Sequence, residues 1–440
     1  MEIAMTSPQH HQRKWIGLDC ALILIALILA LLFPHAAFGA DKKKKADTQQ
    51  APAAAPAAKQ DTSKLMWPSP PNISRVKYSN YFAGMPLDYT PADEQPKKKS
   101  GWMDRLAGVQ DPNNKQHFKP VPFQLIQPYG MAVNSKGQLY VADQKVGGIF
   151  SFNTETKETT IIGNGHEATF GLINNVAIDD DDRLFVTDGK LHRVLIFDKN
   201  NKVVDLIKEG LIDPVGIAID TENRQLYVVD TQADQVVVYD ADTLKEKRRI
   251  GTGGKQHTLT TPGNFALPSF VAVDSDGDVY VTDTLNFRVE IFDADGNFIS
   301  QIGKHCDGPG CFVSPKGIAV DSDKHIWVAD PRMDVLQAFN REGQLLGFVG
   351  QHGNLLGQFS ELVGVYIDKN NRMFTSEQYP GRVQMFRYIT DAEADQLKKE
   401  RETQKANAAA ARQQAAAMDS AKPEASATAA QSAPKADAPK

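Results

Sequence analysis

Cysteine is scarce in this chain, and the motifs of several common enzyme classes are absent. The 440 residues contain three cysteines, which is too few to hold a fold together through disulfides. No C-x-x-C-H haem motif, phosphate-binding loop, G-x-S-x-G or H-E-x-x-H motif occurs. Acids outnumber bases by 54 to 49, so no net positive field points to nucleic acid. The sequence therefore predicts no catalytic residue of these classes, no cofactor and no nucleic-acid partner.

Long apolar runs are confined to the N-terminus. The stretch CALILIALILALLF at residues 20–33 follows a basic segment and precedes small residues at 37–39. This order is typical of a secretory signal peptide. We therefore expect residues 1–40 to be a signal peptide and the protein to be periplasmic or extracellular. The alternative is an uncleaved membrane anchor, because residues 15–33 are just long enough to span a bilayer.

Low-complexity segments flank the remaining chain. Residues 41–66 are rich in Ala, Pro and Lys, which predicts a disordered linker. Residues 391–418 combine Ala with charged helix formers and lack an apolar stripe, so they predict a charged, solvated helix. Residues 419–440 have the composition of a disordered tail.

One pattern recurs six times between these segments. GIAVDSDKHIWVADP at Gly317 and FVAVDSDGDVYVTDT at Phe270 each show two alternating stretches around a polar turn, with an acid ending the second stretch. The six acids stand 42 to 53 residues apart. They are Asp143, Asp188, Asp230, Asp283, Asp330 and Glu377. Short alternating strands repeated at this period are typical of β-propeller blades, so the sequence predicts an all-β propeller of six blades over residues 128–390.

The repeats resemble NHL repeats. The fullest match to the NHL pattern is PSFVAVDSDGDVYVTDTLNFRVEIF, which begins at Pro268. The segments WPSPPNISRVKYSNYFAG and KKKSGWMDRLAG are similar to the extension of exported bacterial NHL proteins of unassigned function. The resemblance implies a six-bladed propeller and leaves the activity open, because this fold carries both enzymes and binding proteins.

The sixth repeat lacks its fourth strand. The chain enters the charged helix directly after the third strand of that repeat. Within the N-terminal extension, residues 67–127, the stretch at 74–84 ends like the fourth strands of other repeats. We therefore expect residues 74–84 to close the ring, since an open ring would expose two strand edges. A short helix is expected at 100–109, packed on the propeller rim or serving as a docking helix.

The six strand-end acids have two interpretations. They could form a ring of acid–base or metal groups, or each could bond its own turn and, in some blades, the arginine that follows. We favour the second interpretation, because a residue repeated in every blade is expected to serve every blade. Four histidines, His166, His257, His305 and His352, fall in loops between blades. Their offsets from the preceding glycine differ, so we expect no shared zinc site.

The resemblance also implies where a metal would lie in lyase relatives that cleave hydroxyglycine peptides. Those proteins place zinc-binding histidines after the loop proline, at the channel mouth. None of the corresponding positions here is a histidine or a carboxylate. They are Tyr129, Asn175, Val215, Ser269, Lys316 and Val363. We therefore predict no metal site.

Cys306 and Cys311 remain once the signal peptide is removed. The loop CDGPGC places Gly and Pro turn residues between them, which brings the two Cα atoms within bridging distance. An oxidising compartment would preserve the bond. We therefore predict a disulfide between Cys306 and Cys311.

The loops that join the strands at one end of the propeller are the expected binding surface. A rigid repeat core leaves loops free to vary, and aromatic, Met and Arg side chains are enriched at interface cores. We predict a binding patch on blades four and five, in which Phe287, Arg332 and Met333 are exposed. Its residues are Phe287, His305, Arg332, Met333 and His352. We expect a monomeric, non-catalytic scaffold that binds an envelope or extracellular protein, or a glycan. The alternative is a metal-dependent hydrolase or lyase that resembles either the gluconolactonases or the amidating lyases.

Overall fold

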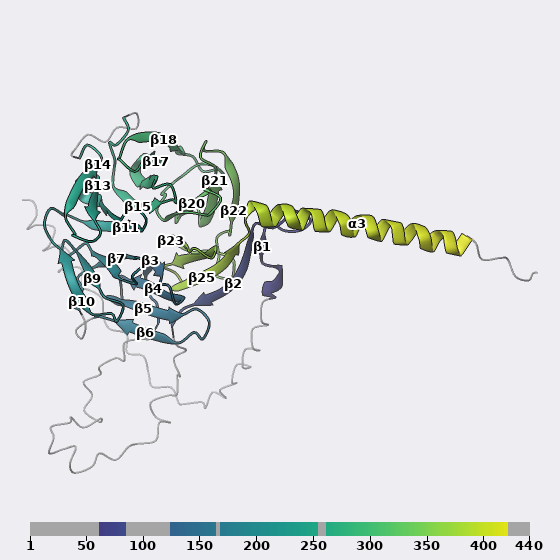
Figure 1. The fold of residues 1–440 in the computed structure, drawn as a ribbon, viewed down its shortest axis with the longest axis horizontal. Helices are drawn as coiled ribbons and strands as arrows, with labels where there is room; N and C mark the ends of the chain where they lie inside the picture. The colour runs from purple at the N-terminus through teal and green to yellow at the C-terminus, as the bar shows by residue number, and fades with distance from the viewer. Residues whose placement is uncertain (1–60, 85–123, 164–167, 254–260, 421–440) are drawn as a thin grey trace, which may run out of the picture. The chain divides into compact units, whose positions relative to one another are not determined.

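Six antiparallel sheets stand side by side around a central axis (Figure 1). The structure is a computed structural model that describes residues 61–84, 124–163, 168–253 and 261–420. Each sheet supplies its first strand to the centre of the ring, and these central strands contact one another between neighbouring blades. The six-bladed propeller predicted from the repeats is therefore confirmed.

Five blades are formed by consecutive strands of the chain. Blades one and two contain β3 (Pro128–Val133), β4 (Gln138–Asp143), β5 (Gly148–Asn153), β6 (Thr159–Ile162), β7 (Ile173–Ile178), β8 (Leu184–Asp188), β9 (Arg193–Phe197) and β10 (Val203–Ile207). Blades three and four contain β11 (Pro214–Asp220), β12 (Gln225–Asp230), β13 (Gln235–Asp240), β14 (Glu246–Ile250), β15 (Pro268–Val273), β16 (Val279–Asp283), β17 (Arg288–Phe292) and β18 (Phe298–Ile302). Blade five contains β19 (Ile318–Val320), β20 (Ile326–Asp330), β21 (Val335–Phe339) and β22 (Leu345–Val349).

Blade six joins the two ends of the propeller sequence. Its inner strands come from the last repeat, and its outer strands come from the N-terminal extension in the order β1-β2-β25-β24-β23. These strands are β1 (Met66–Trp67), β2 (Val76–Phe82), β23 (Leu362–Ile367), β24 (Arg372–Glu377) and β25 (Arg382–Tyr388). β2 pairs antiparallel with β25 from Val76↔Tyr388 to Phe82↔Val383. The predicted closure of the ring by an N-terminal strand is confirmed.

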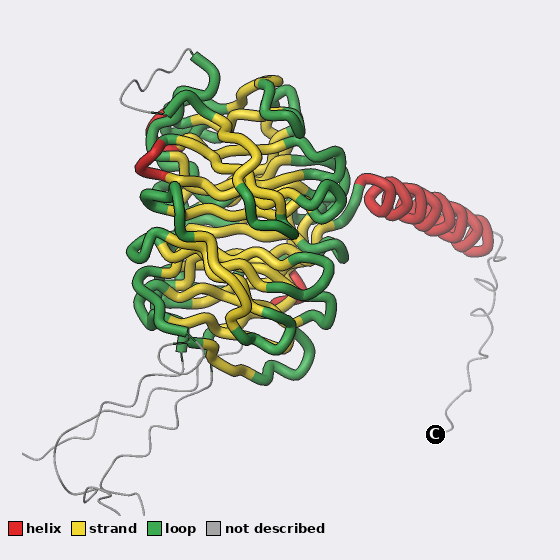
Figure 2. The backbone as a smooth tube through the Cα atoms, turned by 60° about the vertical axis from the view of Figure 1, so that its left-hand side comes forward, coloured by secondary structure: helices red, strands yellow, loops and turns green. Residues whose placement is uncertain are grey.

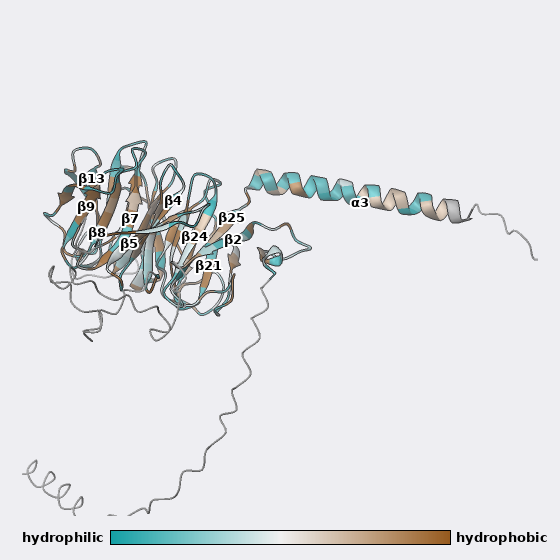
Figure 3. Cartoon of the chain, turned by 90° about the horizontal axis from the view of Figure 1, so that it is seen from below, coloured by the Kyte–Doolittle hydropathy of each residue, from teal (hydrophilic) through white to brown (hydrophobic). Residues whose placement is uncertain are grey.

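The core lies between the blades. Strands β16, β17 and β20 are buried along their whole length, because each sheet is covered by a blade on either side. The hydrophobic strands stand out against the polar turns in Figure 3, and strands and connecting loops separate clearly in Figure 2. Side chains on both faces of these strands therefore pack against the neighbouring blades.

Three short 3-10 helices also occur in the described residues. They are η1 (Thr62–Lys64), η2 (Thr231–Ala233) and η3 (Thr284–Asn286).

The helix α3 (Asp391–Ser420) follows β25 directly. Its side chains are mostly exposed over 391–417, and it is polar along most of its length (Figure 3). Arg75 pairs with Asp391 at its start, and Arg401 donates to the carbonyl of Pro71. No helix in the described ranges is long and apolar enough to cross a membrane.

Several expectations fall outside the described residues. The signal peptide at 1–40, the helix at 100–109 and most of the tail at 419–440 lie there. Residues 41–60 of the predicted linker at 41–66 also lie outside the described residues. The remaining linker residues form η1 and begin β1.

Candidate functional site

The acids that end the second strand of each blade hold the loops of one face. Asp143 is fully buried and accepts four backbone N–H groups. Two belong to the incoming segment, Ile126 at 2.6 Å and Gln127 at 3.0 Å, and two to its own turn, Lys145 at 3.0 Å and Val146 at 2.9 Å. This carboxylate therefore ties the incoming segment and its own turn to the end of β4.

The same arrangement recurs around the ring. Asp330 accepts the backbone N–H of Val313 at 2.7 Å and of Ser314 at 2.9 Å. In three blades an arginine from the third strand also pairs with the acid. These pairs are Asp188–Arg193 at 3.6 Å, Asp283–Arg288 at 2.8 Å and Glu377–Arg382 at 2.9 Å. The geometry supports the structural interpretation of the six acids.

Phe287 and His305 meet on this loop face. Phe287 caps η3 in a left-handed conformation, and its ring lies 4.3 Å from the imidazole of His305 between centroids. Phe287 is only partly exposed, because it also packs against the apolar core between blades four and five. The expectation of an exposed Phe287 is therefore wrong; the neighbouring Leu285, 53% exposed, presents the apolar surface there.

The other predicted residues form a second local group. In the turn between β20 and β21, Arg332 is exposed, whereas Met333, which was also expected to be exposed, is only partly so. His352, on the loop after β22, bonds through Nδ1 to Asp334 at 2.7 Å and has a highly exposed side chain. Each histidine thus contacts the turn of its own blade, and within the described residues no hydrogen bond or ion pair links the two groups.

The loop between β18 and β19 is closed by a covalent link. Cys306 and Cys311 form the predicted disulfide, with their Cα atoms 5.2 Å apart. Cys311 is buried, whereas His305 beside the bridge is exposed. The disulfide therefore anchors a surface loop to the core. His166 and His257 lie outside the described residues.

An aromatic pair and a lysine occupy the channel mouth. Tyr129 of blade one stacks on Phe270 of blade four, with ring centroids 5.3 Å apart. The ammonium group of Lys316 lies 5.7 Å from the centroid of Tyr129 and has no acid partner among the described side chains. Burial lowers the pKa of Lys316 and raises the pKa of Tyr129. From the sequence, Tyr129 and Lys316 were identified only as positions without a metal ligand, and Phe270 was not identified. The convergence of these three side chains follows from closure of the ring.

This donor set does not fit a zinc or calcium ion. Tyr129 and Phe270 fill the mouth with aromatic rings, and the ammonium of Lys316 would repel a cation. The channel beyond is a cavity of about 260 Å³ lined mostly by apolar residues of the first strands. No metal-dependent step is therefore assigned to the channel.

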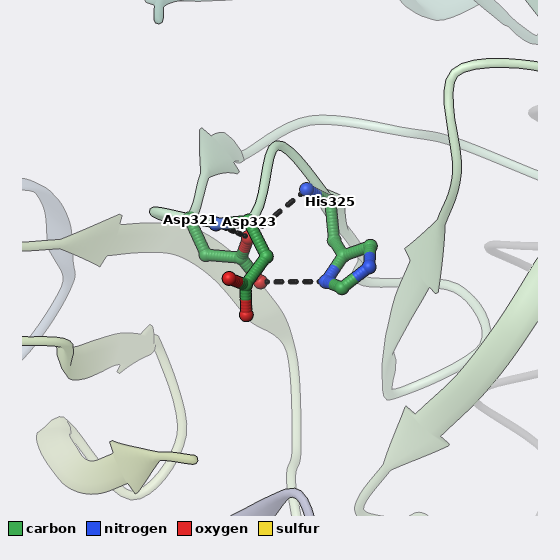
Figure 4. A group of neighbouring side chains, drawn as sticks. All are labelled: Asp321, Asp323 and His325. Carbon is green, nitrogen blue, oxygen red and sulfur yellow. Dashed lines mark hydrogen bonds and ion pairs between the residues drawn. The ribbon is translucent and has the colours of Figure 1, made fainter. Parts of the chain in front are cut away.

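A group of metal-ligand type residues does occur at a turn on the opposite face. Asp321, Asp323 and His325 lie between β19 and β20, with their ligand atoms within 4.8 Å of one another (Figure 4). Asp321 accepts the indole N–H of Trp327 at 2.8 Å, and Asp323 accepts the hydroxyl of Tyr388 at 2.6 Å. Both carboxylates are thus engaged in hydrogen bonds. The sequence DSDKH places two aspartates and a histidine at alternate positions, so this group could have been predicted from the sequence. Its contact with Tyr388 could not, because Tyr388 is distant in the chain.

Comparison with known proteins agrees with this architecture. The family described as SMP-30/Gluconolactonase/LRE-like region matches residues 102–313, and the family described as 6-bladed beta-propeller matches residues 259–421. Both matches agree with the six-bladed β-propeller of the structure, and its repeats are similar to those of NHL-type propellers.

The chain is also similar to a curated protein from an animal. The chain is 29% identical over 224 residues to Caenorhabditis elegans "Probable peptidyl-alpha-hydroxyglycine alpha-amidating lyase pgal-1". That match covers 50% of this chain and 57% of the relative, so the chain spans little more than half of the curated relative.

Two solved structures are similar to this chain. A Bacteroides thetaiotaomicron protein of unknown function has a TM-score of 0.50 and 15% identity, over 60% of this chain and 70% of its own. A gluconolactonase from Xanthomonas campestris has a TM-score of 0.45 and 16% identity, over 60% of this chain and 88% of its own.

Proposed function

We propose that this propeller is an exported, non-catalytic scaffold that binds an envelope or extracellular protein through the loop face of blades four and five. The observation that carries the proposal is the stapled loop, in which the Cys306–Cys311 bridge holds exposed His305 beside Phe287. A preorganised loop loses little conformational entropy on binding. A disulfide also favours an oxidising compartment over the cytoplasm.

The surface chemistry suits a protein partner. The apolar Leu285 is 53% exposed in the turn beside Phe287, and Leu355 is 60% exposed in the loop that carries His352. Exposed Arg332 lies in the turn between β20 and β21. Apolar side chains beside arginine are typical of protein interfaces. A glycan is the other class of ligand in this proposal, and binding of purified glycans to the protein is measured for comparison with binding of the protein partner.

A metal-dependent lyase or hydrolase is the second candidate. The similarity to the C. elegans protein named as a probable amidating lyase favours it. The channel mouth argues against it, because Tyr129 and Lys316 stand at positions that correspond to metal ligands in such lyases, and Phe270 stacks on Tyr129 there. Stoichiometric zinc or calcium whose removal abolishes a hydrolytic or lyase activity would favour the enzyme over the scaffold.

The scaffold is tested by differential capture from the native envelope. His305→Ala, Arg332→Ala and His352→Ala are combined in one variant, because all three side chains are exposed. We expect this variant to lose the partner identified with the unchanged protein while its melting temperature stays within about 2 °C. The matched control combines Lys136→Ala and Lys199→Ala, exposed residues in turns of the opposite face, and should retain the partner. Equal capture by the two variants would refute the patch.

Export is tested separately by N-terminal sequencing of the protein recovered from the envelope fraction. A signal peptide over residues 1–40 predicts a mature start near residue 40. A protein that starts at Met1 and remains in the cytoplasm would contradict export, and a membrane-bound protein that starts at Met1 would support the anchor instead.

A further inference from the structure

The group Asp321, Asp323 and His325, on the face opposite the binding loops, has the residue types of a metal site. One ligand atom of each residue lies within 4.8 Å of the other two (Figure 4). Oδ2 of Asp321 and Nδ1 of His325 are 3.2 Å apart. Two ligands of a tetrahedral zinc ion, each about 2.0 Å from the metal, are about 3.3 Å from each other. This pair therefore already has the spacing of zinc ligands.

Histidine stands in blade five where two other blades have arginine. In blades two and six, the first acid of the same turn accepts a hydrogen bond from an arginine four residues later. These pairs are Asp179–Arg183 and Asp368–Arg372, each with 2.7 Å between Oδ2 and Nε. The corresponding pair in blade five is Asp321–His325. Arginine only donates and stays charged, whereas imidazole can coordinate a metal ion. Blade five thus has a metal ligand in place of a fixed cation.

The negative charge of this group is not balanced by neighbouring side chains. Asp321 and Asp323 contribute two carboxylates. Lys324 lies between them and His325 in sequence, but it pairs with acids of blade four. Arg75 is close to the group, and its charge is compensated by a third carboxylate, that of Asp391. The excess charge is therefore negative, and a divalent cation would balance it.

The two carboxylates are held in place and still have lone pairs for an ion. Oδ2 of Asp321 accepts the indole N–H of Trp327 at 2.8 Å, which leaves its second lone pair for a metal. Oδ2 of Asp323 accepts from the hydroxyl of Tyr388 at 2.6 Å and from the backbone N–H of Asp391 at 2.8 Å. Oδ1 of Asp323 accepts no hydrogen bond from a described residue. Hydrogen bonds of this kind orient the ligands of metal sites.

A pocket of about 530 Å³ gives an ion access to the group. His325 and Tyr388 belong to its lining, together with apolar side chains that include Trp67 and Trp327. Asp323 is partly exposed as well. The group therefore has the entry path that a metal site needs, and water can reach the remaining coordination position.

We propose that Asp321, Asp323 and His325 bind a divalent transition-metal ion, and that zinc is the ion they fit. The imidazole distinguishes zinc from calcium and magnesium, which take oxygen ligands. Nδ1 of His325 coordinates the ion, and the single proton of the neutral ring is then on Nε2. Three protein ligands leave the fourth position of zinc to water.

The ion connects blade five to the seam where the ring closes. Its ligand Asp323 bonds to Tyr388 in β25 and to the backbone of Asp391 at the start of α3. A ligand that binds only the folded chain stabilises the fold, so zinc is expected to strengthen this seam. The inference is independent of the proposed loop-face function, because the two sites lie on opposite faces.

The first test measures metal binding to the purified full chain, stripped with EDTA and then exchanged into buffer at about pH 7.5. Calorimetric titration with zinc chloride should show a site with a Kd of about 10 µM or tighter, and calcium chloride should bind there at least about tenfold more weakly. Zinc at about a hundredfold excess over Kd should raise the melting temperature by at least about 3 °C. Calcium that binds as tightly as zinc, or no zinc site tighter than about 100 µM, would overturn the proposal.

Variants of the ligands locate the site. His325→Arg gives blade five the residue that blades two and six have at this position, so it should fold and lose this zinc site. Asp323→Asn removes a carboxylate from a partly exposed turn and should weaken zinc binding at least about tenfold. The matched control is His192→Asn, which removes an exposed imidazole from the loop face of blade two and should leave zinc binding unchanged.

The outcome remains decisive if one variant is unstable. Should His325→Arg fail to fold, Asp323→Asn decides by the same titration. A folded variant of either ligand that keeps the full zinc affinity and the full thermal shift would refute this site. Loss of the zinc site in His192→Asn would refute it as well, since the ion would then lie on the loop face.

Discussion

Arg75 and Ile389 bond to each other twice across 314 positions of sequence. The backbone N–H of Ile389 donates to the carbonyl of Arg75 at 2.7 Å, and Nε of Arg75 donates to the carbonyl of Ile389 at 3.2 Å. These bonds extend the pairing of β2 with β25 to the start of α3. The ring is therefore held shut by the two ends of the described chain.

Closure predicts that the N-terminal strand is needed for stability. Deletion of residues 74–84 should lower the melting temperature by more than about 10 °C, because it exposes β25 and removes the buried Val76 and Phe82. Deletion of residues 41–59 is the control and should change it by less than about 2 °C. Thermal unfolding followed by circular dichroism measures both, and equal losses would contradict this account of closure.

The disulfide predicts resistance to alkylation. Native protein treated with iodoacetamide after unfolding, without reductant, should gain no label at Cys306 or Cys311, and two labels should appear after reduction. Replacing both residues by serine should cost about 2 kcal/mol of unfolding free energy, because the short loop gains freedom in the unfolded chain. Two labels without reductant would show that the cysteines are free.

Asp143 is expected to be essential for loop anchoring. Asp143→Ala leaves four backbone N–H groups without their acceptor, so we expect a loss of about 2 to 4 kcal/mol of unfolding free energy. Asp295→Ala is the control, since Asp295 is exposed in a turn of the opposite face, and it should change stability by less than about 0.5 kcal/mol. Denaturant unfolding compares the two variants, and similar values would disprove the anchoring role.

Glu290 makes stability depend on pH. Its carboxyl group is fully buried beside Arg288 and accepts the backbone N–H of Gly263 at 2.8 Å. Burial raises the pKa of Glu290 to about 7, above its value in the unfolded chain. Ionisation is therefore harder in the folded state, and this group lowers stability as pH rises from about 4.5 through 7.

Glu290→Gln should remove that dependence. The amide keeps an acceptor for Gly263, and Arg288 keeps its partner Asp283, so the fold is expected to persist. The variant should gain about 1 to 3 kcal/mol relative to the unchanged protein between pH 5 and pH 8. Urea unfolding at both pH values measures the difference, and a difference that stays constant with pH would refute the assignment to Glu290.

The local sequence pattern was sufficient to predict the six blades. Alternating apolar residues place one set of side chains between neighbouring sheets, and the acid at each second strand end lies within bonding distance of loops close to it in sequence. The last repeat lacked its fourth strand, and the stretch at 74–84 ended like the fourth strands of other repeats, so ring closure could also be predicted. The Cys306–Cys311 bridge joins residues five positions apart, so its spacing could be judged directly.

Contacts between distant segments were decided by the tertiary structure alone. Burial of Phe287 depends on blade five, and the stacking of Tyr129 on Phe270 depends on blades that face each other across the channel. The pocket around Tyr388 and Trp67 combines both ends of the described chain with blade five. Periodicity encodes which face of a strand is buried, but it carries no information about which side chains meet once the ring closes.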